Sequence, residues 1–259
     1  MNKIEWQTNA YETVGEHQVP YVLTIADGYN QGSGIKRTSK LKLILKTTVW
    51  PMLKLRNNLM VDGFIEWEIG KFIKKYITNK ECFLEVGCGD MSLRKFIPKK
   101  LWYNALDLEL SDFHIIRTFK SKQNVNIVVT SATEIPTPSN SVSLIVSSET
   151  FEHIPEIDKA IQEIYRIATP NAILICSIPN NYCYKYKKKG PHSQHINNWR
   201  YEEFIEYMKS HRFEFVEGSM KGKWIPFPLW VTETSYQLPV SSKLEHYNTN
   251  FFYVFKASK

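Results

Sequence analysis

The sequence predicts an α/β protein built on a doubly wound, mostly parallel β-sheet. Short apolar runs typical of buried strands alternate with amphipathic helical patterns from about residue 60 onward, and a glycine turn follows the first of these runs. Such alternation produces βαβ units, which cover both faces of a parallel sheet with helices. The alternation stops near residue 212, where two strand-like runs follow each other without a crossover helix. We therefore expect seven strands, the last two forming an antiparallel hairpin at one edge of the sheet.

The chain divides near residue 60 into an N-terminal accessory segment, residues 1–59, and a main domain, residues 60–259. The accessory segment is irregular, and from Lys36 to Arg56 it carries seven basic residues and no acidic one. Apolar residues in that stretch predict one or two short amphipathic helices interrupted at Pro51. A cap packed on the main domain and a membrane-surface or substrate-gating element are both open interpretations.

The main domain starts with a helix that begins at Asp62, a suitable N-cap, and ends near Thr78. A buried strand at 82–86 follows and is stopped by Gly87. Further elements are expected in the following order: strands at 101–106, 124–129 and 142–147, a helix with Pro155 in its first turn that ends at Ile167, a strand at 172–178, a polar loop at 180–198, a helix at 201–210, and strands at 213–218 and 246–256.

Composition and charge limit the class of protein. Of the 259 residues, 43% are apolar and 23% are charged, so the signature of disorder is absent. The net charge of +7 permits an anionic partner without requiring one. No apolar run approaches the roughly 18 residues of a spanning helix, the opening residues lack a signal-peptide pattern, and the four cysteines form no C-x-x-C pair. We expect a cytoplasmic protein with free thiols and no transmembrane segment, with peripheral membrane contact open.

The residues that carry chemistry begin with the run LEVGCGD, residues 84–90. Gly87 and Gly89 follow a buried strand, where only a backbone without Cβ lets a ligand approach closely. Asp107 ends the next strand 20 residues after Gly87, at a place where a carboxylate can accept both hydroxyls of a ribose. Ser92 stands where a dinucleotide-binding fingerprint has its third glycine. The pattern therefore indicates a nucleoside site and argues against a nicotinamide enzyme.

The successive motifs resemble those of the class I, Rossmann-like S-adenosylmethionine-dependent methyltransferases. The resemblance covers about residues 60–256 and is carried by LEVGCGDMSL, LDLEL, ATEIP and SVSLIVSSETFEHI, and then by EIYRIATPNAILICSIPN and HINNWRYEEFIEYMKSHRFEFVE. It implies an enzyme with a Rossmann-like sheet that uses S-adenosylmethionine as its cofactor. We assign no metal ligand.

The resemblance also implies roles for seven residues around the cofactor. They are Glu85 near the ammonium group, Gly87 and Gly89 along the methionine portion, Asp107 at the ribose, Ala132 and Thr133 around the adenine ring, and Ser147 at the start of the loop beneath the sulfonium. A simple tight turn remains an alternative for the two glycines, and a strand-end ion pair remains one for Glu85. Met91 and Ser131 depart from the family pattern, which often has glycine and aspartate there.

The absence of two motifs narrows the range of acceptor classes. Residues 147–151 replace the Asp/Asn-Pro-Pro-aromatic run of methyltransferases that modify base amines, and no cysteine follows a proline. We expect the small-molecule branch, with a small hydroxylated acceptor such as a sugar or glycan-linked metabolite. An RNA or protein methyltransferase and an inactive cofactor-binding subunit are the alternatives, and nucleic acid is not the expected partner.

The polar loop at 180–198 is one candidate acceptor surface, since its tyrosines and lysines suit a sugar ring or an anionic group. A solvated loop is the equally simple interpretation. His153 and His195 are the candidate general bases, because histidine titrates near neutral pH. Either could instead be an ordinary hydrogen-bonded surface residue.

Overall fold

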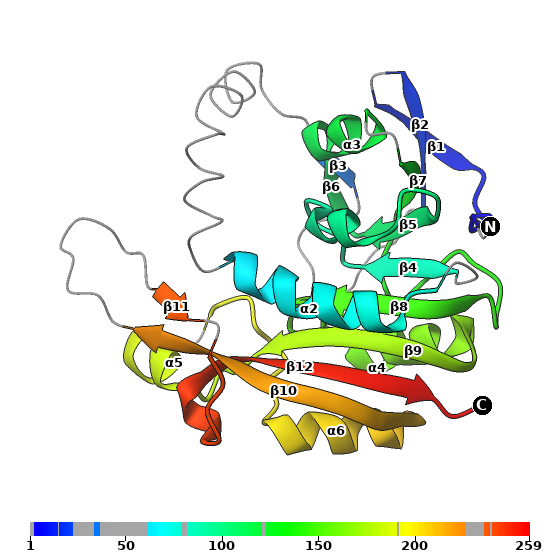
Figure 1. Cartoon of the computed structure of the whole chain (residues 1–259). Helices are drawn as coiled ribbons and strands as arrows, with labels where there is room; N and C mark the ends of the chain where they lie inside the picture. The colour runs from blue at the N-terminus through cyan, green and yellow to red at the C-terminus, as the bar shows by residue number, and fades with distance from the viewer. Residues whose placement is uncertain are drawn as a thin grey trace.

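In the computed structural model the described residues are 3–14, 16–22, 34–36, 62–78, 82–120, 123–190, 192–225, 236–238 and 240–259. They form a ten-stranded sheet in the order β1-β2-β7-β5-β4-β8-β9-β12-β10-β11, with helices on both faces (Figure 1). A second sheet pairs only β3 with β6 among these residues.

The strands are β1 Ala10–Val14, β2 His17–Tyr21, β3 Gly34–Lys36, β4 Phe83–Val86, β5 Trp102–Asp107, β6 Glu109–Ser111, β7 Asn124–Val129, β8 Val142–Ser148, β9 Ala168–Pro179, β10 Phe213–Ile225, β11 Tyr236–Leu238 and β12 Asn248–Ala257. The α-helices are α2 Asp62–Tyr76, α3 Asp112–Phe119, α4 Ile157–Ile167, α5 Tyr184–Lys189 and α6 Tyr201–Ser210, and the 3₁₀ turns are η1 Ser92–Phe96, η2 Phe151–His153 and η3 Glu245–Tyr247.

The predicted fold class is confirmed. Strands β7, β5, β4, β8 and β9 pair in parallel, and β12 lies antiparallel between β9 and β10. The two strands of the predicted C-terminal hairpin are β10 and β12. Strand β12 lies next to β9, and β10 and the short β11 lie further toward the edge of the sheet. Because the carboxyl ends of the parallel strands share one edge of the sheet, the loops that follow them meet there.

The accessory segment differs from its predicted irregular structure. Strands β1 and β2 form an antiparallel hairpin, and Tyr21 pairs with Val129 at the end of β7, so residues 10–21 extend the main sheet. Alternation over short stretches such as Ala10–Val14 gave too weak a signal to predict an edge strand. The predicted amphipathic helices between Lys36 and Arg56 lie almost wholly outside the described residues.

Two apolar layers hold the helices to the sheet. Strand β12 shows the arrangement: Phe251, Tyr253 and Phe255 face the layer under α4 and α6, while Phe252 and Val254 face the layer under α2. This alternation follows from the period of two along a strand. Figure 1 shows α2 on one face of the sheet and α4 on the other.

Several boundaries differ from the sequence prediction for local reasons. Helix α4 starts at Ile157, two residues after Pro155, so the proline precedes the helix instead of lying in its first turn. The loop at 180–198 contains the short helix α5, which is followed by Gly190 with a positive φ of 80°. The four cysteines are free thiols, as predicted, and all four are buried. No helix of the described residues has the length and apolar character needed to cross a membrane.

Candidate cofactor and acceptor site

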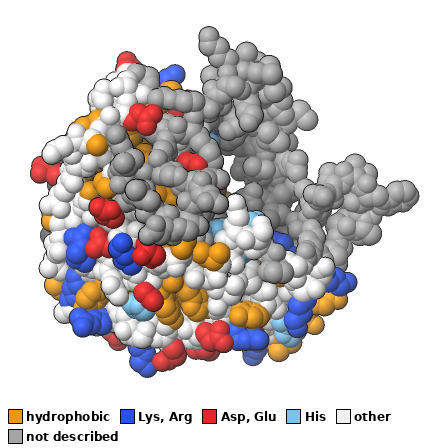
Figure 2. All heavy atoms as spheres, turned by 180° about the vertical axis from the view of Figure 1, so that it is seen from behind, with side chains coloured by type: hydrophobic (Ala, Val, Ile, Leu, Met, Phe, Trp, Pro, Cys, Tyr) orange, Lys and Arg blue, Asp and Glu red, His pale blue; other side chains and the backbone are white. Residues whose placement is uncertain are grey.

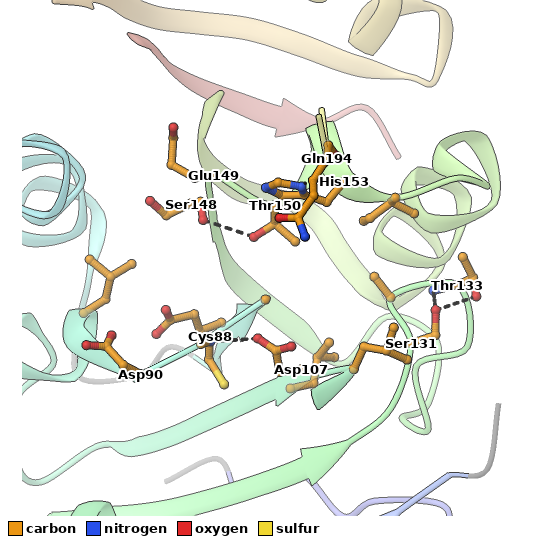
Figure 3. A pocket seen from close by; sticks show the side chains of 18 of the residues that line it. Cys88, Asp90, Asp107, Ser131, Thr133, Ser148, Glu149, Thr150, His153 and Gln194 are labelled. Atoms are coloured by element: carbon orange, nitrogen blue, oxygen red, sulfur yellow. Dashed lines mark hydrogen bonds between the residues drawn. The ribbon is translucent and has the colours of Figure 1, made fainter. Parts of the chain in front are cut away.

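A cavity of about 430 Å³ opens at the carboxyl ends of the central parallel strands. It is lined from four segments, within 85–93, 106–108, 131–133 and 148–156, and by Gln194. These segments follow β4, β5, β7 and β8, which are neighbours in the sheet. Figure 3 shows Asp107 on one side of the cavity, with His153 and Gln194 across from it.

The glycine turn after β4 has the backbone that the sequence predicts. Gly87 has a φ of 74°, and a Cβ on it would lie 2.2 Å from Oγ1 of Thr150. Gly89 has a φ of 48°, but a Cβ there would meet no atom within 4 Å, because this residue borders the open cavity. The amide N–H groups of Gly87 and Cys88 both donate to the carbonyl oxygen of Leu106, at 2.9 and 3.0 Å. The turn is thereby fixed to the end of β5.

Asp107 connects the glycine turn to the segment that follows β5. Its Oδ2 accepts a hydrogen bond from the amide of Gly89 at 2.7 Å, and its Oδ1 accepts one from the amide of Glu109 at 3.2 Å. Burial raises the pKa of this carboxyl group, while the backbone N–H groups of Gly89, Glu109 and Leu108 act against that rise. Asp107 thus presents a half-buried carboxylate to the cavity, held in place by main-chain donors.

Glu85 also lines the cavity, from the interior of β4. Its side chain is only 3% exposed, and its Oε2 accepts a 2.6 Å hydrogen bond from the Tyr103 hydroxyl. Burial raises the pKa of Glu85 to about 8, and the nearby Asp90 and Asp107 carboxylates add to the rise. A positive group in the cavity would therefore find an uncompensated acid beside it.

The segment after β7 contributes Ser131, Ala132 and Thr133 to the cavity wall. Oγ of Ser131 and Oγ1 of Thr133 lie 2.8 Å apart, and Oγ of Ser131 also accepts the Thr133 amide at 3.1 Å. The Ser131 hydroxyl is therefore used to shape its own loop. Ala132 and Thr133 lie at the cavity, as their predicted role requires.

Ser147 does not lie where the sequence analysis placed it. Strand β8 continues to Ser148, so the loop starts one residue later, and Ser148, Glu149 and Thr150 line the cavity instead. Because side chains alternate along a strand, the Ser147 side chain points into the interior, where its hydroxyl is buried without a hydrogen-bond partner.

His153 lines the cavity, whereas His195 lies behind it and is not among the lining residues. The two rings are 5.0 Å apart. Nδ1 of His153 lies 2.9 Å from the Gln194 carbonyl oxygen, and Nδ1 of His195 lies 2.9 Å from Oδ1 of Asn181. Burial lowers the pKa of His153, and it lowers the pKa of His195 to about 4 with the help of the neighbouring His153 and His192.

Sequence reasoning missed two acids beside these histidines, Glu149 and Glu152. Glu149 has a φ of 52°, lines the cavity, and accepts a 2.8 Å hydrogen bond from Nδ2 of Asn250. Glu152 is 1% exposed, and its Oε2 has no hydrogen-bond partner. Both residues stand in the run SSETFEHI, yet nothing in its spacing indicates that the chain buries two carboxylates there.

The chain has the fold of the class I, Rossmann-like methyltransferases. Residues 84–176 match the model of the methyltransferase domain family. Among curated proteins, the ubiquinone/menaquinone biosynthesis C-methyltransferase UbiE of Rickettsia bellii is 30% identical over 155 residues, which are 55% of this chain and 62% of that protein. The match thus spans less than two thirds of that relative.

Solved structures show the same fold at low sequence identity. The 1,6-didemethyltoxoflavin-N1-methyltransferase of Burkholderia thailandensis, with bound 1,6-didemethyltoxoflavin and S-adenosylhomocysteine, has a TM-score of 0.54 and 11% identity, covering 85% of this chain and 90% of that one. An S-adenosylmethionine-dependent methyltransferase from Methanosarcina mazei has a TM-score of 0.53 and 14% identity, covering 72% and 96%.

Proposed function

We propose that the protein binds S-adenosylmethionine in the strand-end cavity and transfers its methyl group to a small molecule. The observation that carries the proposal is the convergence of Gly89, Asp107 and Thr133 on one cavity from three neighbouring strands. Supporting it are the match to the methyltransferase domain family and the curated relatives of that activity.

The residues of the cavity fit this cofactor. The open position beside Gly89 leaves room for a ligand against the backbone. Glu85 is a buried acid to which an ammonium group would restore its missing counter-charge. Asp107 offers carboxylate oxygens for ribose hydroxyls, and Ala132 and Thr133 form the wall proposed for the adenine ring.

When bound, the cofactor supplies a methyl group on a sulfonium centre, which is an excellent leaving group. The main task of the chain is therefore to bind and orient the cofactor and the acceptor and to exclude water. Activation of the acceptor is less important. Orientation of this kind lowers a barrier by up to about 7–11 kcal/mol. Asp107 and the glycine turn form one rigid unit through the 2.7 Å hydrogen bond to Gly89, so this part of the site is preorganised.

The acceptor side of the cavity is proposed to lie at His153 and Gln194, across from Asp107 (Figure 3). Since a carbonyl oxygen can only accept, Nδ1 of His153 carries the ring proton and Nε2 is left with a free lone pair. That nitrogen is suited to take a proton from an acceptor or to hold a cation. His195 lies behind His153 and does not line the cavity, so it is proposed to affect the acceptor only through neighbouring residues.

A small molecule is the proposed acceptor class. The matched relatives are named for ubiquinone and menaquinone biosynthesis, and no comparison supports the sugar or glycan-linked acceptor. Figure 2 shows basic and acidic side chains interspersed on the face it displays, without one continuous basic patch of the kind that nucleic-acid binding favours. Four buried free cysteines among the described residues are consistent with the proposed cytoplasmic location.

Calorimetry tests the cofactor assignment directly. We expect saturable one-to-one binding of S-adenosylhomocysteine and none of NAD; binding of NAD alone would overturn the assignment. The second step is transfer of labelled methyl groups to a panel of quinone precursors and sugars, with the methylated atom identified by NMR. A chain that binds the cofactor product but labels only RNA or protein would exclude the small-molecule class.

A further inference from the structure

Behind the cavity wall, three side chains that can ligate a metal converge from two separated segments. Glu152 and His153 come from η2, and His195 comes from the loop before α6. One potential ligand atom from each lies within 4.8 Å of the others. Side chains of this composition, two imidazoles and one carboxylate, are a known ligand set for divalent transition-metal ions.

Both histidines are in the tautomeric form that leaves Nε2 free to bind a metal. Nδ1 of His153 donates to the Gln194 carbonyl oxygen, and Nδ1 of His195 donates to the Asn181 amide oxygen. In each ring Nε2 is therefore the unprotonated nitrogen. Metal-binding histidines are oriented in this way by a hydrogen bond from the other ring nitrogen to an oxygen. In His153, Nε2 lies 3.6 Å from Oε1 of Glu152.

Glu152 supplies an independent reason to expect a cation. Its side chain is almost completely buried, and its Oε2 has no hydrogen-bond partner. Nearby Glu149 is half-buried and has partners of its own: its Oε2 accepts a hydrogen bond from Asn250, and Ser177 and Lys185 also act to lower its pKa against the effect of burial. Burying a carboxylate without a partner is costly, and a bound cation removes that cost.

The backbone around the triad is held firmly. The amides of Ile196 and Asn197 donate to the carbonyl oxygen of Glu152 at 2.9 and 3.1 Å. The Asn197 side chain donates to the carbonyl oxygens of Phe151 and Ile154 at 2.9 and 2.6 Å. These bonds fix the loop that carries His195 onto the turn that carries Glu152, so the triad is a built feature of the fold.

We propose that Glu152, His153 and His195 form a binding site for one divalent cation of the Zn²⁺ or Co²⁺ type. Imidazole ligands favour these ions over Mg²⁺ and Ca²⁺, which prefer oxygen ligands. Ligand atoms about 2.1 Å from a tetrahedral metal lie about 3.4 Å apart, so the side chains need to contract only slightly around the ion.

The place of the site in the fold suggests what the cation does. His153 belongs to both the triad and the cavity wall, so an ion held there borders the acceptor side of the cavity. A divalent cation lowers the pKa of a water molecule or hydroxyl group whose oxygen it binds. This role rests on the proposed function, whereas cation binding itself does not.

The test is a titration of chelator-treated protein with Co²⁺, followed by calorimetry and by the visible absorption of the bound ion. We expect one equivalent to bind, with affinity lowered at least about tenfold in Glu152→Gln and in His195→Gln, since even loss of an outer partner costs about 10–100-fold. His211→Gln is the matched control, because His211 lies 3.3 Å from a carboxylate oxygen of the exposed Asp158, away from the triad.

Absence of saturable Co²⁺ and Zn²⁺ binding at millimolar concentration, or equal affinity in the wild type and His195→Gln, overturns the site. If Glu152→Gln does not fold, the test rests on His195→Gln alone, because His195 is only half-buried. S-adenosylhomocysteine binding is measured on the same samples. Co²⁺ binding without S-adenosylhomocysteine binding rejects the proposed function and leaves the cation site, and the reverse result rejects the cation site alone.

Discussion

The amide of Gly89 donates a 2.7 Å hydrogen bond to Oδ2 of Asp107, and this bond joins the turn after β4 to the end of β5. The proposed methionine and ribose contacts are therefore parts of one hydrogen-bonded unit. Substitution of Asp107 affects both the ligand and the turn, so an alanine variant by itself does not separate the two effects.

Asp107→Asn separates them. The amide keeps a carbonyl oxygen that can accept from Gly89, but it loses the negative charge that strengthens hydrogen bonds to ribose hydroxyls. We expect S-adenosylhomocysteine affinity to fall about tenfold or more in calorimetry, corresponding to about 1.5 kcal/mol, the lower end for a hydrogen bond to a charged group. The melting temperature without ligand should fall less than in Asp107→Ala, because only the longer hydrogen bond, from the Glu109 amide at 3.2 Å, loses its acceptor.

Asp107→Ala should lower both affinity and melting temperature, because the amides of Gly89 and Glu109 lose their acceptor. Glu134→Gln, an exposed substitution in the loop after β7, is the control for both. If Asp107→Asn binds S-adenosylhomocysteine as tightly as the wild type does, the carboxylate has only a structural role.

Gly87 and Gly89 should respond differently to the same substitution. In Gly87→Ala the new Cβ meets the Thr150 side chain, so stability should fall by more than the about 1–3 kcal/mol of backbone strain at positive φ. In Gly89→Ala the Cβ meets only the cavity, so the loss should fall mainly on ligand affinity. Melting temperature and calorimetric affinity, measured for both variants, give the comparison.

Gly190→Ala supplies the reference for strain alone, since Gly190 has a φ of 80° and a Cβ there would meet nothing within 4 Å. Gly87→Ala should be clearly less stable than Gly190→Ala. Equal S-adenosylhomocysteine affinity in Gly89→Ala and the wild type would mean that the ligand does not lie against this turn.

The sequence predicted the central sheet because its signals are local. Strand β4 is an apolar run ended by Gly87, and α4 repeats isoleucine at helical spacing, so both follow from short-range patterns. The positions of the proposed cofactor residues at the sheet edge follow as well, since Gly87 directly follows β4, Asp107 ends β5, and these strands are neighbours in the sheet.

The acceptor side was not predictable in the same way. His195 reaches Glu152 only because main-chain bonds fold the loop at 192–197 onto η2, more than 40 residues away along the chain. The end of β8 was set one residue too early, so the start of the loop was assigned to Ser147, which lies buried inside the strand. Burial of the Glu149 and Glu152 carboxylates likewise depends on tertiary packing that leaves no trace in residue spacing.

The raised pKa of Glu85 predicts that the stability of the folded chain depends on pH. Its pKa is raised from 4.5 to about 8 in the folded chain, so the native state keeps a proton that the unfolded chain releases. Stability therefore falls as the pH rises between these two values, by up to about 1.4 kcal/mol per pH unit from this group. Glu85→Gln keeps an acceptor for the Tyr103 hydroxyl and removes the titration.

Thermal melts from pH 5 to 8 should show the wild type losing stability relative to Glu85→Gln as the pH rises. A ligand ammonium group favours the ionised acid, so wild-type affinity for S-adenosylhomocysteine should rise from pH 6 to 7.5, and that of Glu85→Gln should not. Parallel pH profiles for the two proteins in both experiments would show that Glu85 neither titrates in this range nor meets the ammonium group.

The hydrogen bonds of Arg166 predict that the position of the proposed adenine wall depends on α4, a helix outside the cavity. From α4, its guanidinium donates to the carbonyl oxygens of Thr137 and Ile135, both at 2.8 Å, and to Glu163. Glu163 in turn accepts the Ile135 amide at 3.1 Å. This pair holds the loop that begins with the cavity residues 131–133, and opposite charge on the two partners strengthens each bond.

Arg166→Met keeps much of the aliphatic stem and removes every donor. We expect the melting temperature to fall, with a loss of about 1.5–3 kcal/mol for hydrogen bonds to a charged group, and S-adenosylhomocysteine affinity to fall with it because the loop loses its anchor. Lys159→Met is the matched control, since Lys159 lies on the same helix, has a side chain that is 57% exposed, and forms a long ion pair with Glu156 at 3.9 Å. A less stable Arg166→Met that binds S-adenosylhomocysteine with wild-type affinity would show that residues 131–133 form no part of the ligand site.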